Sequence, residues 1–161
     1  MARSVSGARR WLFGMAAVCL AAVVAALVSQ YVFDMQPCPW CILQRLTFVA
    51  IGGVCLLAAL WSAPAPRTLL TAGALVLATL GIATAVYQHE VAAKSQSCNL
   101  TLADRIITAL RADTAAPWLF EVKASCADAA VTMLGLPYEY WALVLFALLG
   151  IAALRVLLQR R

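Results

Sequence analysis

Two cysteines separated by two residues offer the clearest chemistry in this sequence, in the run Cys38-Pro39-Trp40-Cys41. Thiols at this spacing can close into a disulfide and reopen, which moves two electrons. Arg45 follows Cys41 by four residues, so on a helix both side chains lie on one face. Pro39 suits the first turn of a helix, whose free N–H groups favour a thiolate. We therefore expect a redox-active thiol pair at the start of a helix.

A second pair of cysteines, Cys98 and Cys126, lies in the long segment that is least apolar. Together with Cys38 and Cys41 they allow three connectivities, of which Cys38–Cys41 and Cys98–Cys126 is the natural one. The second disulfide is either a structural staple or part of a relay. In a relay, the dithiol of a partner protein opens it, and a freed thiolate then attacks the first disulfide.

The composition places these thiols in a membrane protein. Of 161 residues, 65% are hydrophobic and only 12% are charged, against about 25% in soluble proteins. Four apolar stretches approach the roughly 20 residues that span a bilayer as a helix: about 11–31, 41–61, 69–87 and 137–158. The predicted fold is an all-α bundle of four membrane helices in one domain. Two prolines keep the turn at 62–67 short, and Cys19 and Cys55 are expected to be small buried hydrophobes within the spans.

The charges predict the orientation of this bundle. The tail before the first span, the turn after the second and the end of the chain hold seven basic residues and no acid: Arg3, Arg9, Arg10, Arg67, Arg155, Arg160 and Arg161. All seven acids lie on the other side. By the positive-inside rule both termini are cytoplasmic, and loops 32–40 and 88–136 face outward. The outside is the oxidising side, where disulfides persist. The net charge of +5 thus reflects topology rather than nucleic-acid binding. A cleavable signal is the alternative for the first span, but its length favours a retained helix.

The large outer loop contains two segments with their own signals. Residues 101–112 are expected to form a short helix, capped by Thr101 or Asn99 and with Asp104 in its first turn. Residues 116–120, which include a tryptophan and a phenylalanine, suit a segment that lies along the membrane interface. An ordinary apolar patch covering the loop is the alternative.

Two further residues could bind a lipid-soluble electron carrier. Arg45 is costly inside a span, so it either reaches back to the headgroups or supports the Cys41 thiolate and holds a negative oxygen of the carrier. His89, the only histidine, ends the third span and is either a satisfied polar residue or a proton donor beside that carrier. We expect no metal, because no second Cys-x-x-Cys and no histidine cluster completes a zinc site. A structural disulfide or metal half-site remains the alternative for the first pair.

The order of these features resembles the bacterial disulfide bond formation protein B (DsbB) family over essentially the whole chain. The resemblance rests on four spans with both ends inside and on these motifs: Cys38-Pro-Trp-Cys41 followed by Ile-Leu-Gln-Arg45, Tyr87-Gln-His89-Glu, Cys98, Ala124-Ser-Cys126-Ala-Asp, Leu134-Gly-Leu136 and Trp141. The Pro-Trp dipeptide, the Asn-Leu-Thr-Leu run after Cys98 and the residues around Pro137 depart from the family pattern.

This resemblance implies an inner-membrane oxidoreductase that reoxidises a periplasmic DsbA-like thiol oxidase and passes the electrons to ubiquinone or menaquinone. In the family, the cysteine matching Cys98 forms the mixed disulfide with the partner, and the one matching Cys126 passes electrons toward Cys38. The cysteine matching Cys41 contacts the quinone, with the residues matching Arg45 and His89 beside it.

Two other functions remain open on the sequence. The vitamin K epoxide reductase family also combines Cys-x-x-Cys with a four-helix membrane bundle, but there the motif usually lies in a late helix rather than at the start of the second. The chain could also be a membrane scaffold whose disulfides only staple its loops.

Overall fold

Four long helices make up most of the molecule. The computed structural model describes residues 2–94, 101–133 and 135–159. The long helices are α1 (Ala2–Val32), α2 (Pro39–Leu60), α3 (Pro64–Glu90) and α7 (Tyr138–Leu158). Over the described residues, all four are long and apolar enough to cross a membrane. The predicted all-α bundle of four membrane helices is confirmed, and each predicted span lies within one helix except for Trp61 and Pro137 at span ends.

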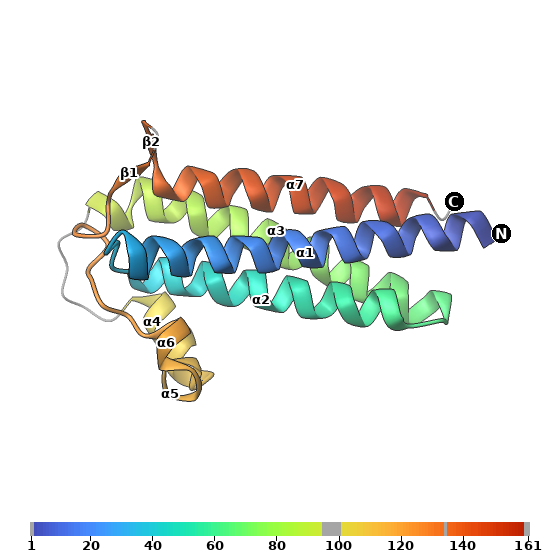
Figure 1. Ribbon diagram of the computed structural model, residues 1–161, viewed down its shortest axis with the longest axis horizontal. Coiled ribbons are helices and arrows are strands. Elements are labelled where there is room, and N and C mark those ends of the chain that lie inside the picture. The colour runs from blue at the N-terminus through green and yellow to red at the C-terminus, as the bar shows by residue number, and fades with distance from the viewer. Residues whose placement is uncertain (1, 95–100, 134, 160–161) are drawn as a thin grey trace.

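The helices pack in chain order. α1 packs on α2, α2 on α3 and α3 on α7, while α1 and α7 contact each other much less. Figure 1 shows the two chain ends at one end of the bundle and the short elements at the other. This arrangement follows from an even number of antiparallel helices, and it gathers the loops with the cysteine motifs at a single end.

The short elements at that end come mainly from the predicted outer loop. They are η1 (Ala92–Lys94), α4 (Leu102–Ala109), α5 (Ala112–Ala115), α6 (Pro117–Phe120), β1 (Thr132–Met133) and β2 (Leu136–Pro137). β1 and β2 pair antiparallel, in a hairpin that the sequence did not predict. α4 begins as predicted, because the Thr101 side chain and the Asp104 carboxylate form a reciprocal capping box. The helix ends at Ala109 rather than at 112, and Asn99 lies outside the described residues.

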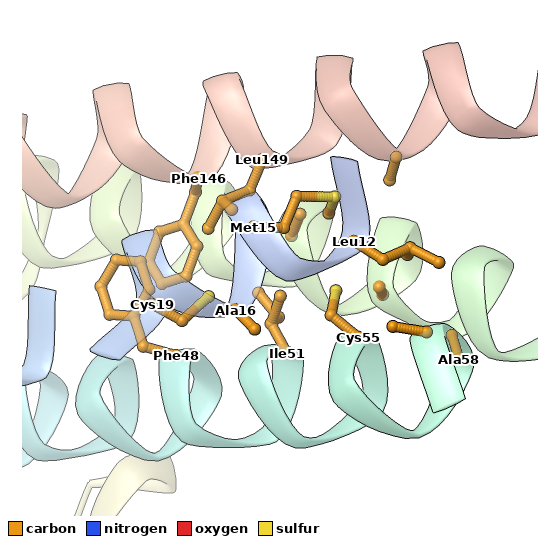
Figure 2. Packing of buried hydrophobic residues seen from close by; sticks show 14 of the residues in the cluster. Leu12, Met15, Ala16, Cys19, Phe48, Ile51, Cys55, Ala58, Phe146 and Leu149 are labelled. Atoms are coloured by element: carbon orange, nitrogen blue, oxygen red, sulfur yellow. The ribbon is translucent and has the colours of Figure 1, made fainter. Parts of the chain in front are cut away.

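The core of the bundle is built around two stacked rings. Phe48 of α2 and Phe146 of α7 lie parallel with their centroids 4.1 Å apart. Gly81 of α3 makes room for them, since a Cβ there would lie 2.5 Å from the Phe146 ring. Cys19 and Cys55 are buried in the same cluster, as predicted (Figure 2). They sit in the apolar interior and act as small hydrophobic side chains.

The turn between α2 and α3 is shorter than predicted. α3 begins at Pro64, so Pro64 and Pro66 belong to its first turn, where a missing N–H leaves no intrahelical bond broken. Arg67 is buried rather than free in solvent. Its guanidinium donates to the Trp61 carbonyl at 2.6 Å and to the Ser62 carbonyl at 3.4 Å. The arginine thereby satisfies carbonyl groups at the C-terminal end of α2.

Candidate active site

The N-terminus of α2 holds the Cys-x-x-Cys pair. Cys38 is the N-cap residue, and its Sγ accepts the backbone N–H of Cys41 at 3.4 Å. Pro39 occupies the first helical position, where proline fits best. Both cysteines are thiols here, with their Sγ atoms 3.0 Å apart. A disulfide bond measures about 2 Å, so its closure needs only a small shift of the side chains.

Cys38 faces the outer loop. It is fully buried in a cluster that includes Cys126, whose sulfur interacts with the Cys38 thiol. The loop carrying Cys126 is fixed to the start of α2 by two backbone hydrogen bonds. The N–H groups of Lys123 and Ala124 both donate to the Pro37 carbonyl, at 3.0 and 3.2 Å. These bonds place Cys126 beside Cys38, although the two cysteines are far apart in sequence.

The contact between these two sulfurs separates their acidities. Hydrogen bonding with Cys126 is the main reason that the pKa of the Cys38 thiol is raised, and its contact with Cys41 and its burial act in the same direction. The same hydrogen bonding lowers the pKa of Cys126, against the opposing effect of burial and with help from the Trp40 backbone N–H. In the reduced protein, Cys126 therefore becomes a thiolate more readily than Cys38.

Cys41 also packs against the cluster that holds Cys38 and Cys126, but it lines a cavity of about 300 Å³ enclosed by α1, α2, α7 and the loop segments 35–37 and 129–133. Small and aromatic side chains dominate its wall, which includes Ala22, Ala25, Ala26, Ser29, Gln44, Arg45, Phe48, Tyr138, Trp141 and Leu145. Among the described residues, neither Cys38 nor Cys126 lines this cavity. The two sulfurs of the pair thus open onto different surroundings, although they lie in contact with each other.

Arg45 contributes the cavity's positive charge. It is 6% exposed, so it lies within the bundle rather than reaching to the headgroups. Its guanidinium donates to the Gln30 side chain at 2.6 Å, the Ala26 carbonyl at 3.1 Å and the Leu119 carbonyl at 3.3 Å. These contacts tie α2 to α1 and α6. Because a guanidinium has five N–H groups, donors remain for a molecule in the cavity.

Two buried glutamines lie beside Cys41 and were not predicted as site residues. The Gln88 amide on α3 donates to the Cys41 Sγ at 3.3 Å. The Gln44 amide on α2 donates to the Gln88 carbonyl oxygen at 2.8 Å. The available signal was their position, since each is a polar residue at the outer end of an apolar span.

The structure does not bring His89 into the cavity with Cys41 and Arg45. Its Nδ1 lies 2.7 Å from the Glu139 carboxylate, and its ring meets the edge of Tyr140 with centroids 4.9 Å apart. These residues line a separate cavity of about 60 Å³ between α3 and α7. The role of His89 at the carrier stays a prediction. Cys98, the predicted attachment point of the partner, lies outside the described residues.

Comparison with known proteins agrees with this arrangement of thiols. The family model of the disulfide bond formation protein DsbB matches residues 8–156. The chain belongs to the DsbB family. Within that family, it is similar to a disulfide bond formation protein B of Stutzerimonas stutzeri, with 33% identity over 94% of this chain and 96% of that protein. It is also similar to the disulfide bond formation protein B 1 of Pseudomonas syringae, with 31% identity over 95% of this chain and 91% of that protein. A homologue from Cupriavidus metallidurans shares 31% identity over 96% of both chains.

DsbB membership and the four spanning helices together define the protein broadly. It is a multi-pass protein of the bacterial inner membrane with a disulfide-forming oxidoreductase role.

Proposed function

We propose that the protein oxidises the dithiol of a periplasmic DsbA-type thiol oxidase and delivers the two electrons to membrane quinone. The observation that carries this proposal is that the two cysteines at the start of α2 have different neighbours. Cys38 contacts Cys126 of the outer loop, whereas Cys41 lines the cavity between α1, α2 and α7. A disulfide between them would connect a thiol donor on one side to an electron acceptor on the other.

The relay can be written with thiols of this chain and its partner. A partner thiolate attacks the Cys98–Cys126 disulfide, bonds to Cys98 and releases Cys126. The Cys126 thiolate then attacks Cys38, which breaks the Cys38–Cys41 bond and leaves Cys41 as the thiolate. The second partner thiol completes the partner's own disulfide and releases Cys98, which re-forms its bond to Cys126 and frees Cys38. The net result is one partner disulfide, with two electrons and two protons held at Cys38 and Cys41.

The cavity fits a quinone ring. Its volume of about 300 Å³ and its largely apolar wall suit an aromatic headgroup, and Tyr138 and Trp141 add flat faces. Arg45 would hold a quinone oxygen, and its charge favours the Cys41 thiolate beside it. Bound there, a quinone supplies the two-electron acceptor. Such an acceptor is needed because DsbA-type oxidants have potentials of about −120 mV, which few cellular oxidants exceed.

The proposed orientation places this chemistry at the periplasmic face. Both termini would be cytoplasmic by the positive-inside rule, so the end of the bundle with Cys38, Cys41 and Cys126 would face the periplasm. The exposed Trp118 and the Tyr31 hydroxyl, which donates to the Trp118 carbonyl at 2.7 Å, lie at this end. An interfacial position for α6 accounts for the exposed indole.

The test uses purified full-length protein, a soluble quinone analogue and a reduced DsbA-type partner. We expect quinone reduction to match partner oxidation one to one, and Cys38→Ser or Cys41→Ser to abolish both. Cys19→Ser is the matched control, because Cys19 lies in the bundle core and does not line the cavity. Quinone reduction that survives Cys38→Ser and Cys41→Ser would exclude the proposed enzyme and leave a scaffold.

A further inference from the structure

The electron path leaves one feature beside Cys41 without a role, namely the two buried glutamines of α2 and α3. Gln44 and Gln88 are each 5% exposed. A buried amide costs free energy unless its donors and acceptor find partners. Here the partners include a reactive sulfur, since Gln88 donates to Cys41 at 3.3 Å. The two amides therefore not only satisfy each other's hydrogen-bonding groups but also donate a hydrogen bond to Cys41.

The hydrogen bond between the glutamines fixes which end of Gln88 faces the sulfur. Gln44 donates to the Gln88 carbonyl oxygen at 2.8 Å, so that oxygen turns toward α2 and the NH₂ group turns toward Cys41. The opposite orientation would set the two NH₂ groups against each other and place a carbonyl oxygen against the sulfur. Gln44 thus acts on Cys41 through Gln88.

A neutral N–H donor at this position favours the thiolate of Cys41 over the thiol. The donor stabilises negative charge on sulfur, and its effect is stronger in a buried site than in water. Its ability to donate does not depend on pH, because an amide stays neutral throughout the working pH range. Arg45 lines the same cavity and supplies the cationic counterpart, but it is bonded to α1 and α6 rather than to the glutamines.

We propose that Gln88 stabilises the Cys41 thiolate by direct hydrogen bonding and that Gln44 is a positioning residue that orients the Gln88 amide. The inference deepens the proposed function, on which it rests for the role of Cys41 as the sulfur facing the carrier. The hydrogen-bonded pair would keep Cys41 as a reactive thiolate each time the Cys38–Cys41 disulfide is opened.

The test measures the thiolate itself, without quinone or partner. Full-length protein is reduced anaerobically and alkylated with iodoacetamide across a pH series, and each cysteine is followed by mass spectrometry. Because an N–H donor to an anion is worth at least about a factor of ten, we expect Gln88→Met to slow Cys41 alkylation near neutral pH about tenfold. The pH midpoint of the reaction should rise correspondingly. Gln44→Met should give a similar loss.

The double variant distinguishes an effect of Gln44 that acts through Gln88 from independent effects of the two glutamines on Cys41. If Gln44 works only through Gln88, Gln44→Met should add nothing in the Gln88→Met background. Gln88→Glu provides a near-isosteric second variant, and its carboxylate, when ionised, should slow Cys41 further than Met does, because it both lacks a donor and repels the thiolate. Protection of the buried Cys19 and Cys55 from alkylation in the same samples is the internal control for folding and should be retained.

Several results would overturn the inference. Unchanged or faster alkylation of Cys41 in Gln88→Met would show that the amide does not stabilise the thiolate. Multiplying losses in the double variant would show that Gln44 does not act through Gln88. Since neither quinone nor partner is present, these outcomes are independent of whether the proposed oxidase activity exists.

Discussion

At the scale of single residues, the contact between their sulfurs gives Cys126 and Cys38 different acidities. Hydrogen bonding between them is the largest cause that raises the pKa of Cys38 and lowers that of Cys126. The Trp40 backbone N–H adds a second donor to Cys126 that belongs to the first turn of α2. The helix start thus directs N–H groups at Cys126 and Cys38, as expected for an N-terminus that favours anions.

This contact predicts a change at Cys126 when Cys38 is altered. In reduced protein, Cys38→Ala removes the S–H donor, so the pKa of Cys126 should rise and less thiolate should be present at a given pH. We expect Cys126 alkylation near neutral pH to slow by about threefold to tenfold, as for the loss of one modest hydrogen bond. Cys38→Ser, which keeps a hydroxyl donor, should retain most of the rate. An unchanged rate in Cys38→Ala would mean that the contact does not control Cys126.

Arg45 leads to a second prediction at this scale. Arg45→Ala removes the cavity's cation, so the KM for quinone should rise by about tenfold or more, as expected for a lost charged hydrogen bond. The KM for the reduced partner should stay unchanged, because the cavity wall does not include Cys38 or Cys126. Arg105→Ala, at an exposed position of α4, is the control. Equal changes in both constants would contradict the placement of Arg45 at the carrier.

At the scale of elements, the close contact of α3 with α7 positions one wall of the cavity. Gly81 lets the Phe146 ring approach the α3 backbone, and Phe146 in turn stacks on Phe48, which lines the cavity. The packing of three helices therefore converges on two aromatic rings. A side chain at Gly81 must displace the ring or separate the helices.

The glycines of α3 provide a matched pair of variants. Gly81→Ala would place a Cβ 2.5 Å from the Phe146 ring, so we expect a loss of about 2 kcal/mol in the free energy of unfolding. Gly73→Ala, in the same helix with nothing within 4 Å of the added Cβ, should be neutral or slightly stabilising. Thermal unfolding in detergent would measure both. Equal stability of the two variants would show that this contact is not a constraint on packing.

The elements also show where sequence reasoning succeeded and where it stopped. The four spans and the Thr101 cap were predictable, because apolar length and capping chemistry are local signals. The β1–β2 hairpin was not, since each strand has only two residues. The separate cavity of His89 was also beyond the sequence. It depends on which face of α3 meets α7, and both sides of the histidine carry polar neighbours.

At the scale of the whole molecule, the bundle brings together residues that the sequence could only name separately. The Cys-x-x-Cys pair and Arg45 could be predicted as a site because one helical turn separates them. Three contacts join distant segments of the chain. They are the contact of Cys126 with Cys38, the hydrogen bond from Arg45 to Gln30 and the hydrogen bond from Gln44 to Gln88. Such contacts depend on the order in which the four helices pack. Local sequence patterns do not predict that order.

The most direct test of the proposed electron path is to trap the complex with a partner whose second active-site cysteine is replaced by serine. The experiment uses quinone-depleted, full-length protein, alkylation of free thiols and mass spectrometry of the non-reduced peptides. We expect a bond from the partner to Cys98, a bond between Cys38 and Cys126, and an alkylated Cys41. A bond between Cys41 and Cys126 with Cys38 alkylated would contradict the assignment of Cys38 to the outer loop and Cys41 to the quinone cavity.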